Sequence, residues 1–131
     1  MRFIVMGKVK SEAAGPPPSP EAFAAMQEYN EEAAKKGILL AAEGLAPTAK
    51  GARVKFSGDN YTVIDGPFTE SKELIAGFLI IQVDSLKDAI DWVKRAPRLM
   101  PTGDIEIRKL MDVEDFGEGF TANEEIAKVK Y

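Results

Sequence analysis

Two carboxylates stand at the ends of strongly apolar segments, where they could do acid–base chemistry. Asp65 closes the segment "YTVID" and precedes Gly66 and Pro67, and Glu43 follows the apolar run "ILLAA". If both side chains enter one dry cleft, they resist double ionisation and the pKa of one of them rises. The pair would then supply a proton donor and a proton acceptor without histidine.

Each carboxylate also has a purely structural interpretation. Asp65 can accept a backbone N–H in an Asx-type turn while Pro67 fixes the chain direction, and this does not exclude a binding role. Glu43 can simply be exposed at the end of a strand. The sequence leaves both interpretations open.

Four further residues complete the candidate ligand-binding set with Asp65 and Glu43: Phe68, Glu70, Lys72 and Arg108. Phe68 can plug the core, and the charged run around Glu70 and Lys72 can be a solvated loop. Arg108 fits either an ion pair inside the fold or an anchor for an anionic ligand. Catalytic residues stay unassigned, with Asp65 and Glu43 as the best candidates.

The composition removes several kinds of chemistry. The 131-residue chain has no histidine and no cysteine, which excludes Ser-His-Asp and Cys-His mechanisms, disulfides and sulfur-ligated zinc. We expect no metal site and no cofactor. A net charge of −4 and a pI near 5.0 argue against a nucleic-acid partner. The apolar start of the chain is too short for a signal peptide or a spanning helix, so we expect a cytoplasmic protein without a membrane partner.

Apolar periodicity and turn residues predict a single α+β domain. Strands are expected at 2–8, 38–45, 53–57, 61–65, 74–83 and 104–110, and helices at 20–36 and from Ser85 towards Pro97. A turn at 58–60 joins the third and fourth strands. This order predicts a ferredoxin-like split βαβ fold, with an antiparallel sheet and both helices on one face.

The helices and the C-terminal segment carry their own signals. Ser19 and Ser85 are expected to cap the two helices. Phe23, Met26 and Ala33 should face the core from the first helix, and Leu86, Ala89, Ile90 and Val93 from the second, with Trp92 packed beside them. The segment 112–125 holds six carboxylates and no basic residue, and Thr121 is expected to cap a short terminal helix.

The sheet should be apolar on both faces. Phe3 and Val5 alternate with Ile4 and Met6, and the segment 74–83 is apolar at both alternating sets of positions. If one such face stayed exposed to solvent, the fold would lose roughly 1.5–3 kcal/mol of burial free energy for each large side chain. We therefore expect a homodimer through the sheet face. The alternative is that the acidic tail folds over this face within one chain.

The segment "YTVIDGPFTESKELIAGFLIIQVDS" resembles the YCII-related family, and specifically its DGPF branch. The similarity rests on Asp65-Gly66-Pro67-Phe68, on the following Thr69, Glu70, Lys72 and Glu73, and on Gly77-Phe78; it extends to "EGL" at 43–45, "IEIR" at 105–108 and "MDVEDFG" at 111–117. The resemblance implies a dimeric α+β barrel with a cleft beside the sheet. It also points to a link with extracytoplasmic-function sigma factors, and so to a protein partner.

The chain departs from this family in two respects. The better-known branch carries a histidine–aspartate pair proposed to be catalytic, and no histidine is present here. Lys109 also stands where the resemblance leads us to expect proline. We divide the chain into an α+β domain at 1–111 and an acidic tail at 112–131 that packs on the domain or on the dimer partner.

The sequence thus leads to two functional hypotheses. The first is a small-molecule binding or regulatory module of unknown ligand, with an acidic cleft near the DGPF motif. The alternative is a cofactor-independent enzyme that uses Asp65 and Glu43 for acid–base chemistry on a small polar substrate.

Overall fold

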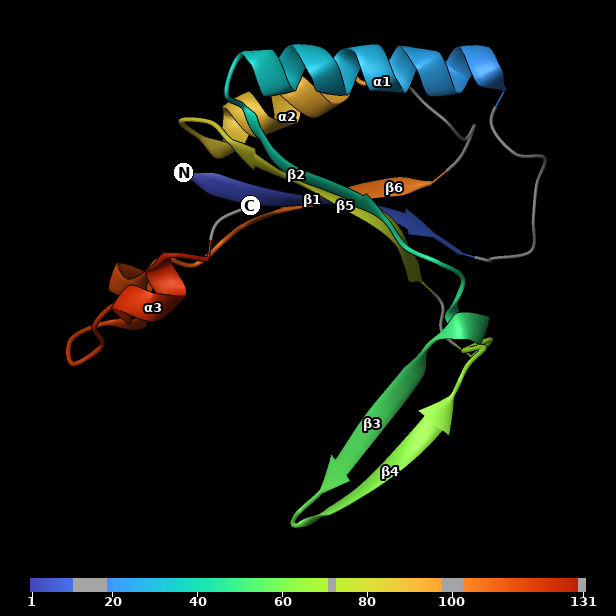
Figure 1. Cartoon of the computed structure of the whole chain (residues 1–131), viewed down its shortest axis with the longest axis vertical. Helices are drawn as coiled ribbons and strands as arrows, with labels where there is room; N and C mark the ends of the chain where they lie inside the picture. Colours follow the sequence, from blue (N-terminus) through green and yellow to red (C-terminus); the bar gives the residue numbers. More distant parts are fainter. Residues whose placement is uncertain (11–18, 71–72, 98–102, 130–131) are drawn as a thin grey trace.

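The computed structural model describes residues 1–10, 19–70, 73–97 and 103–129 as an α+β protein with antiparallel sheets (Figure 1). The expected α+β class is therefore confirmed. The elements, in chain order, are β1 (Arg2–Val9), α1 (Pro20–Lys35), β2 (Leu39–Gly44), the 3-10 turn η1 (Thr48–Lys50), β3 (Ala52–Ser57), β4 (Asn60–Asp65), β5 (Leu74–Gln82), α2 (Leu86–Lys94), β6 (Asp104–Lys109), the 3-10 turn η2 (Val113–Phe116) and α3 (Glu124–Ala127).

Four strands form one sheet in the order β2-β5-β1-β6, and every neighbouring pair is antiparallel. β5 therefore lies between β1 and β2, which run parallel to each other. In the described part of the chain, β3 and β4 pair only with each other, and this hairpin projects from the four-stranded sheet (Figure 1). Asn60 pairs with Ser57 and begins β4, so the predicted turn at 58–60 is one residue shorter. Gly58 has a positive φ of 60°, which suits such a tight turn.

Both long helices lie on the same side of the four-stranded sheet (Figure 1). The core beneath them joins Phe3, Val5 and Ile81 of the strands to Ala33 of α1 and Ala89 and Trp92 of α2. The predicted caps are present, because Ser19 Oγ accepts from the Ala22 N–H and Ser85 Oγ accepts from the Asp88 N–H. Across residues 1–10, 19–70, 73–97 and 103–129, no helix has the length and apolarity needed to cross a membrane.

Two predicted helix faces need correction. Phe23, Leu86 and Ile90 are 55%, 50% and 38% exposed, so none of them belongs to the core. In α1 only Ala33 is buried. In α2 the buried face is centred between Ala89 and Trp92, so Leu86 lies at its margin.

The cap of the terminal helix also differs from the prediction. Asn123 Oδ1 accepts from the N–H groups of Glu125 and Ile126, at 2.9 and 3.1 Å. A capping side chain must come directly before the first helical residue, and α3 begins at Glu124. Asn123 is therefore the cap, not Thr121.

Candidate functional site

The sheet face turned away from α1 and α2, which we call the open face, carries two rows of side chains. Directly opposed residues on neighbouring strands share a face, and side chains alternate along each strand. The rows run Glu43, Phe78, Met6, Glu106 and Ala41, Ile80, Ile4, Arg108, in the order β2, β5, β1, β6.

The open face has an apolar centre and charged edges. Met6 and Ile80, on the two central strands, are only 8% and 6% exposed, and their neighbours Ile4 and Phe78 are half-buried. Glu43 on β2 and Arg108 on β6 are exposed at the two edges. The central strands are thus apolar on both faces, as their sequence predicts.

Lys8 on the central strand β1 lies between two carboxylates, Glu106 on β6 and Glu73 directly before β5. Its Nζ is 2.7 Å from Glu106 Oε1 and 3.1 Å from Glu73 Oε2. The hydrogen bond to Glu106, and then the one to Glu73, raise the pKa of Lys8 above its ordinary value. The hydrogen bond from Lys8 likewise lowers the pKa of Glu106. The two carboxylates therefore keep Lys8 protonated between them.

Arg108 is the most accessible cation of the open face. It stands opposite Ile4, two residues beyond Glu106 on the same edge strand. Among the described residues it forms no ion pair, although its charge helps to lower the pKa of Glu106.

The segment Asp65–Phe68 forms the root of the β3–β4 hairpin. Gly66 donates its N–H to the Gly51 carbonyl at 3.0 Å, and the Gly66–Pro67 peptide is cis. A Cβ on Gly66 would lie 1.7 Å from the Thr48 carbonyl oxygen, so only glycine fits against η1. The motif thus closes the hairpin tightly against the preceding turn.

Phe68 fills the space beneath this root. It is 7% exposed, and its N–H donates to Thr48 Oγ1 at 3.0 Å. The Arg53 guanidinium lies 3.8 Å from the centroid of the Phe68 ring and also pairs with Glu70 Oε1 at 2.7 Å. Lys72, the remaining candidate of this run, lies outside the described residues.

Glu43 and Asp65 belong to different sheets in one chain. Glu43 is opposite Phe78 on β2, whereas Asp65 ends β4 opposite Ala52. Both are exposed, and across the described residues neither carboxylate takes part in a hydrogen bond or an ion pair. Within one chain the two carboxylates therefore come from different sheets.

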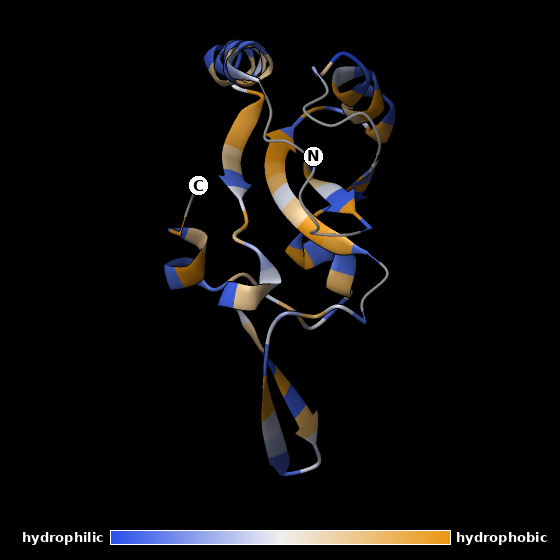
Figure 2. Cartoon of the chain, turned by 90° about the vertical axis from the view of Figure 1, so that its right-hand side faces the viewer, coloured by the Kyte–Doolittle hydropathy of each residue, from blue (hydrophilic) through white to orange (hydrophobic). Residues whose placement is uncertain are grey.

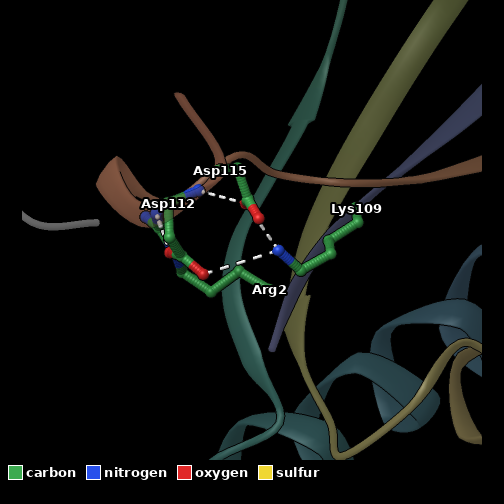
Figure 3. A network of polar contacts seen from close by, with 4 residues as sticks. All are labelled: Arg2, Lys109, Asp112 and Asp115. Carbon is green, nitrogen blue, oxygen red and sulfur yellow. Dashed lines mark hydrogen bonds and ion pairs between the residues drawn. The ribbon is translucent and has the colours of Figure 1, made fainter. Parts of the chain in front are cut away.

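The acidic tail is fixed at its start by a network of four side chains (Figure 3). Lys109 Nζ lies 2.7 Å from Asp115 Oδ2 and 3.6 Å from Asp112, and Arg2 lies 3.5 Å from Asp112. The Asp112 N–H also donates to Asp115, which completes a capping box at η2. Lys109 thus ties the tail to the sheet at the position where proline is expected.

Sequence reasoning missed Lys8 and Glu106 as site residues. The available signal was a lysine in the apolar strand "FIVMGKV" and a glutamate in the alternating "DIEIR". Neither signal shows that the two strands are neighbours with Met6 opposite Glu106, and this register brings Lys8 within reach of Glu106.

The fold and this arrangement can be compared with known proteins. The YCII-related domain model matches residues 1–114, so the chain belongs to the YCII-related family. It is also similar to an uncharacterized protein of Rhizobium meliloti (strain 1021), with 36% identity over 89 residues. The match covers 67% of this chain and 69% of that protein.

Proposed function

We propose that this chain is a small-molecule binding or regulatory module whose ligand lies on the open face of the sheet. One observation carries the proposal: Glu43 and Arg108 flank a partly exposed apolar centre of Ile4 and Phe78. Small-molecule sites typically combine an apolar lining with a few polar groups that fix the ligand's orientation. A small ligand with an anionic group for Arg108 and an apolar body suits this face.

The proposal includes a homodimer in which a second copy covers the open face. Half-buried Ile4 and Phe78 give this face an apolar surface for a partner. The cleft between the copies would carry the carboxylate of Glu43 at one edge of each sheet and the cation of Arg108 at the other, where Glu106 is paired with Lys8. Asp65, Phe68 and Glu70 at the hairpin root, with Lys72 after them, belong to the same proposed neighbourhood.

The finer classification is part of this proposal. The strand order β2-β5-β1-β6 supports a ferredoxin-like split βαβ fold and the dimeric α+β barrel. The signature Asp65–Phe68 supports the DGPF branch of the family. A cytoplasmic location fits the cysteine-free sequence. A sigma-factor-linked partner rests on the resemblance alone.

Thermal-shift profiling against a metabolite library tests the binding function, since stabilisation grows with ligand excess over Kd. We expect anionic metabolites that raise the melting temperature of the wild-type protein. The shift should fall in Arg108→Ala and persist in Lys94→Ala, which removes an exposed cation from α2 on the other side of the sheet. The proposal would be contradicted if no metabolite raised the melting temperature, or if the shift were the same in Arg108→Ala as in the wild type.

The enzymatic alternative needs Asp65 and Glu43 to act on one substrate. Because the two carboxylates lie in different sheets of one chain, we place this alternative second. Its test is Asp65→Asn in the presence of a metabolite that the protein converts. This variant should abolish turnover and leave the melting temperature nearly unchanged, whereas a loss of folding would make Asp65 structural.

A further inference from the structure

The β3–β4 hairpin presents a continuous apolar face to solvent. Val54 pairs with Val63 and Phe56 with Tyr61, so these four side chains share one side of the hairpin. They are 51%, 57%, 75% and 69% exposed, respectively. Figure 2 shows the hydropathy along these strands alternating between the hydrophobic and hydrophilic colours. A two-stranded hairpin is marginal in water by itself, so this face needs a partner.

The tail after η2 presents a second apolar set. Phe116 and Phe120 lie 5.8 Å apart between ring centroids and are 54% and 60% exposed. Ile126 and Val129 are 70% and 80% exposed. The tail therefore buries little of its apolar surface within its own chain.

Both of these arms lie on the open-face side of the sheet. In Figure 1 the helices lie above the sheet, and the hairpin and the tail extend below it from opposite ends. Figure 2, turned by 90°, also shows both arms on the side away from the helices. A second copy that covers the open face must therefore meet both arms.

We propose that, in the homodimer, the apolar face of each hairpin packs on the Phe116–Phe120 tail of the partner. This inference rests on the dimer of the proposed function and adds which surfaces meet. A two-fold axis across the open face can place each hairpin beside the partner's tail, since the arms leave from opposite ends. The partner's arms then close the open face at both ends, so the ligand site is incomplete in one chain.

The exposed area fits a stable dimer. The rings of Phe56, Tyr61, Phe116 and Phe120 leave on the order of 500 Å² uncovered, taking about 200 Å² for each aromatic side chain. With the aliphatic residues of both arms, the sum approaches the roughly 800 Å² that each partner buries in a standard interface. The arms alone thus supply most of the required surface.

Charge disfavours the other two-fold arrangement, in which each tail would lie beside the partner's tail. The tail holds six carboxylates between Asp112 and Glu125, so two tails side by side would repel each other. β3 carries Arg53 and Lys55 on the hairpin side opposite Phe56. A hairpin beside a tail therefore joins two apolar surfaces and keeps the two acidic tails apart, while Arg53 and Lys55 face away from the contact.

Cross-linking of single-cysteine variants tests the contact, because the natural chain has no cysteine. Val63→Cys lies on the apolar face of the hairpin and Thr121→Cys next to Phe120, and both positions are exposed. The two variants carry different tags and are mixed in equal amounts, allowed to exchange subunits and treated with a short bismaleimide. We expect a covalent heterodimer of the two tags. Val63→Cys mixed with Glu31→Cys, an exposed site on α1, should give none.

A second measurement uses the two faces of the hairpin. Phe56→Asp should shift the sedimenting species from dimer towards monomer, whereas Thr62→Asp, on the opposite face of the same hairpin, should not. Covalent dimers within Val63→Cys alone or within Thr121→Cys alone, without the heterodimer, would overturn the pairing. So would equal sedimentation of the two aspartate variants.

The outcomes also separate this inference from the proposed function. If the wild-type protein is a dimer but the heterodimer cross-link does not form, only the proposed pairing of the arms is rejected. If the wild-type protein sediments as a monomer, both the pairing of the arms and the cleft between two copies are rejected. The cross-link without any metabolite-induced thermal shift retains the pairing and rejects the binding function.

Discussion

The guanidinium of Arg53 lies 3.8 Å from the centroid of the Phe68 ring, and this contact joins the start of β3 to the segment that follows β4. Phe68 is buried, and Arg53 also pairs with Glu70. The DGPF segment therefore acts as the root that fixes the direction of the hairpin. The placement of the proposed dimer arm depends on this root.

Removal of the Phe68 ring should destabilise the protein strongly. Phe68→Ala leaves a cavity under the hairpin root, and such substitutions cost about 3–5 kcal/mol. Urea unfolding measures the change in the free energy of unfolding. Phe23→Ala is the matched control, because Phe23 is 55% exposed, and it should change stability by less than about 0.5 kcal/mol. Equal losses in the two variants would contradict the buried position of Phe68.

Gly66 should tolerate no side chain. In Gly66→Ala the new Cβ would lie 1.7 Å from the Thr48 carbonyl oxygen, so η1 and the hairpin root must separate. We expect a clearly lower melting temperature, or loss of the folded circular dichroism spectrum. Gly44→Ala has open space around its Cβ and should be nearly neutral. Wild-type melting temperatures in both variants would disprove the close approach of Gly66 to the Thr48 carbonyl.

Glu106 should titrate below its ordinary pKa of 4.5, because Lys8 donates a hydrogen bond to its carboxylate. Carbon-detected NMR of the side-chain carboxyl measures this pKa. Lys8→Met should raise it, and Lys94→Met on α2 should leave it unchanged. A depressed pKa in the folded state stabilises the fold above pH 4.5 and loses this contribution as pH falls through the folded pKa. The acid side of the stability profile should therefore be flatter in Lys8→Met.

Tyr29 links the two long helices. Its hydroxyl donates to the Trp92 carbonyl at 2.6 Å, and the two rings stack with centroids 4.6 Å apart. Tyr29→Phe keeps the stacking and removes the hydrogen bond, so the free energy of unfolding should fall by about 1 kcal/mol. Tyr61→Phe, with its ring 69% exposed on the hairpin, should show no loss.

The same tyrosine should make stability depend on alkaline pH. Burial raises the pKa of Tyr29 above its ordinary value of 10. The unfolded chain then loses this proton at a lower pH than the folded protein, so stability should fall as pH rises above 10. Melting temperatures at pH 8 and above pH 10 check this, and Tyr29→Phe should remove part of the slope.

Asp115 should hold the start of the tail against the sheet. Asp115→Asn weakens the contact with Lys109 and the bond from the Asp112 N–H (Figure 3). Hydrogen exchange of the Asp112 amide should become faster in this variant. Glu118→Gln, a tail carboxylate with no ion pair among the described residues, should leave that exchange rate unchanged. An unchanged Asp112 rate in Asp115→Asn would show that the network does not order η2.

The order of strands and helices was predictable because it depends on local periodicity and on caps such as Ser19 and Ser85. The helix faces were less predictable. A helix shows which residues are apolar, but the direction in which it crosses the sheet decides that Trp92 is buried and Leu86 is exposed. The proposed site was the least predictable, because its residues come from strands far apart in the sequence.

The sequence by itself determined the alternation of strands and helices, the apolar character of both sides of the central strands and the absence of histidine and cysteine chemistry. These features reside in residue types and in their spacing along the chain. Only the tertiary structure decided that Lys8 meets Glu106 and that Glu43 and Asp65 lie in different sheets. The pairing register of strands far apart in sequence sets these neighbours, and the alternation within one strand carries no information about its partner.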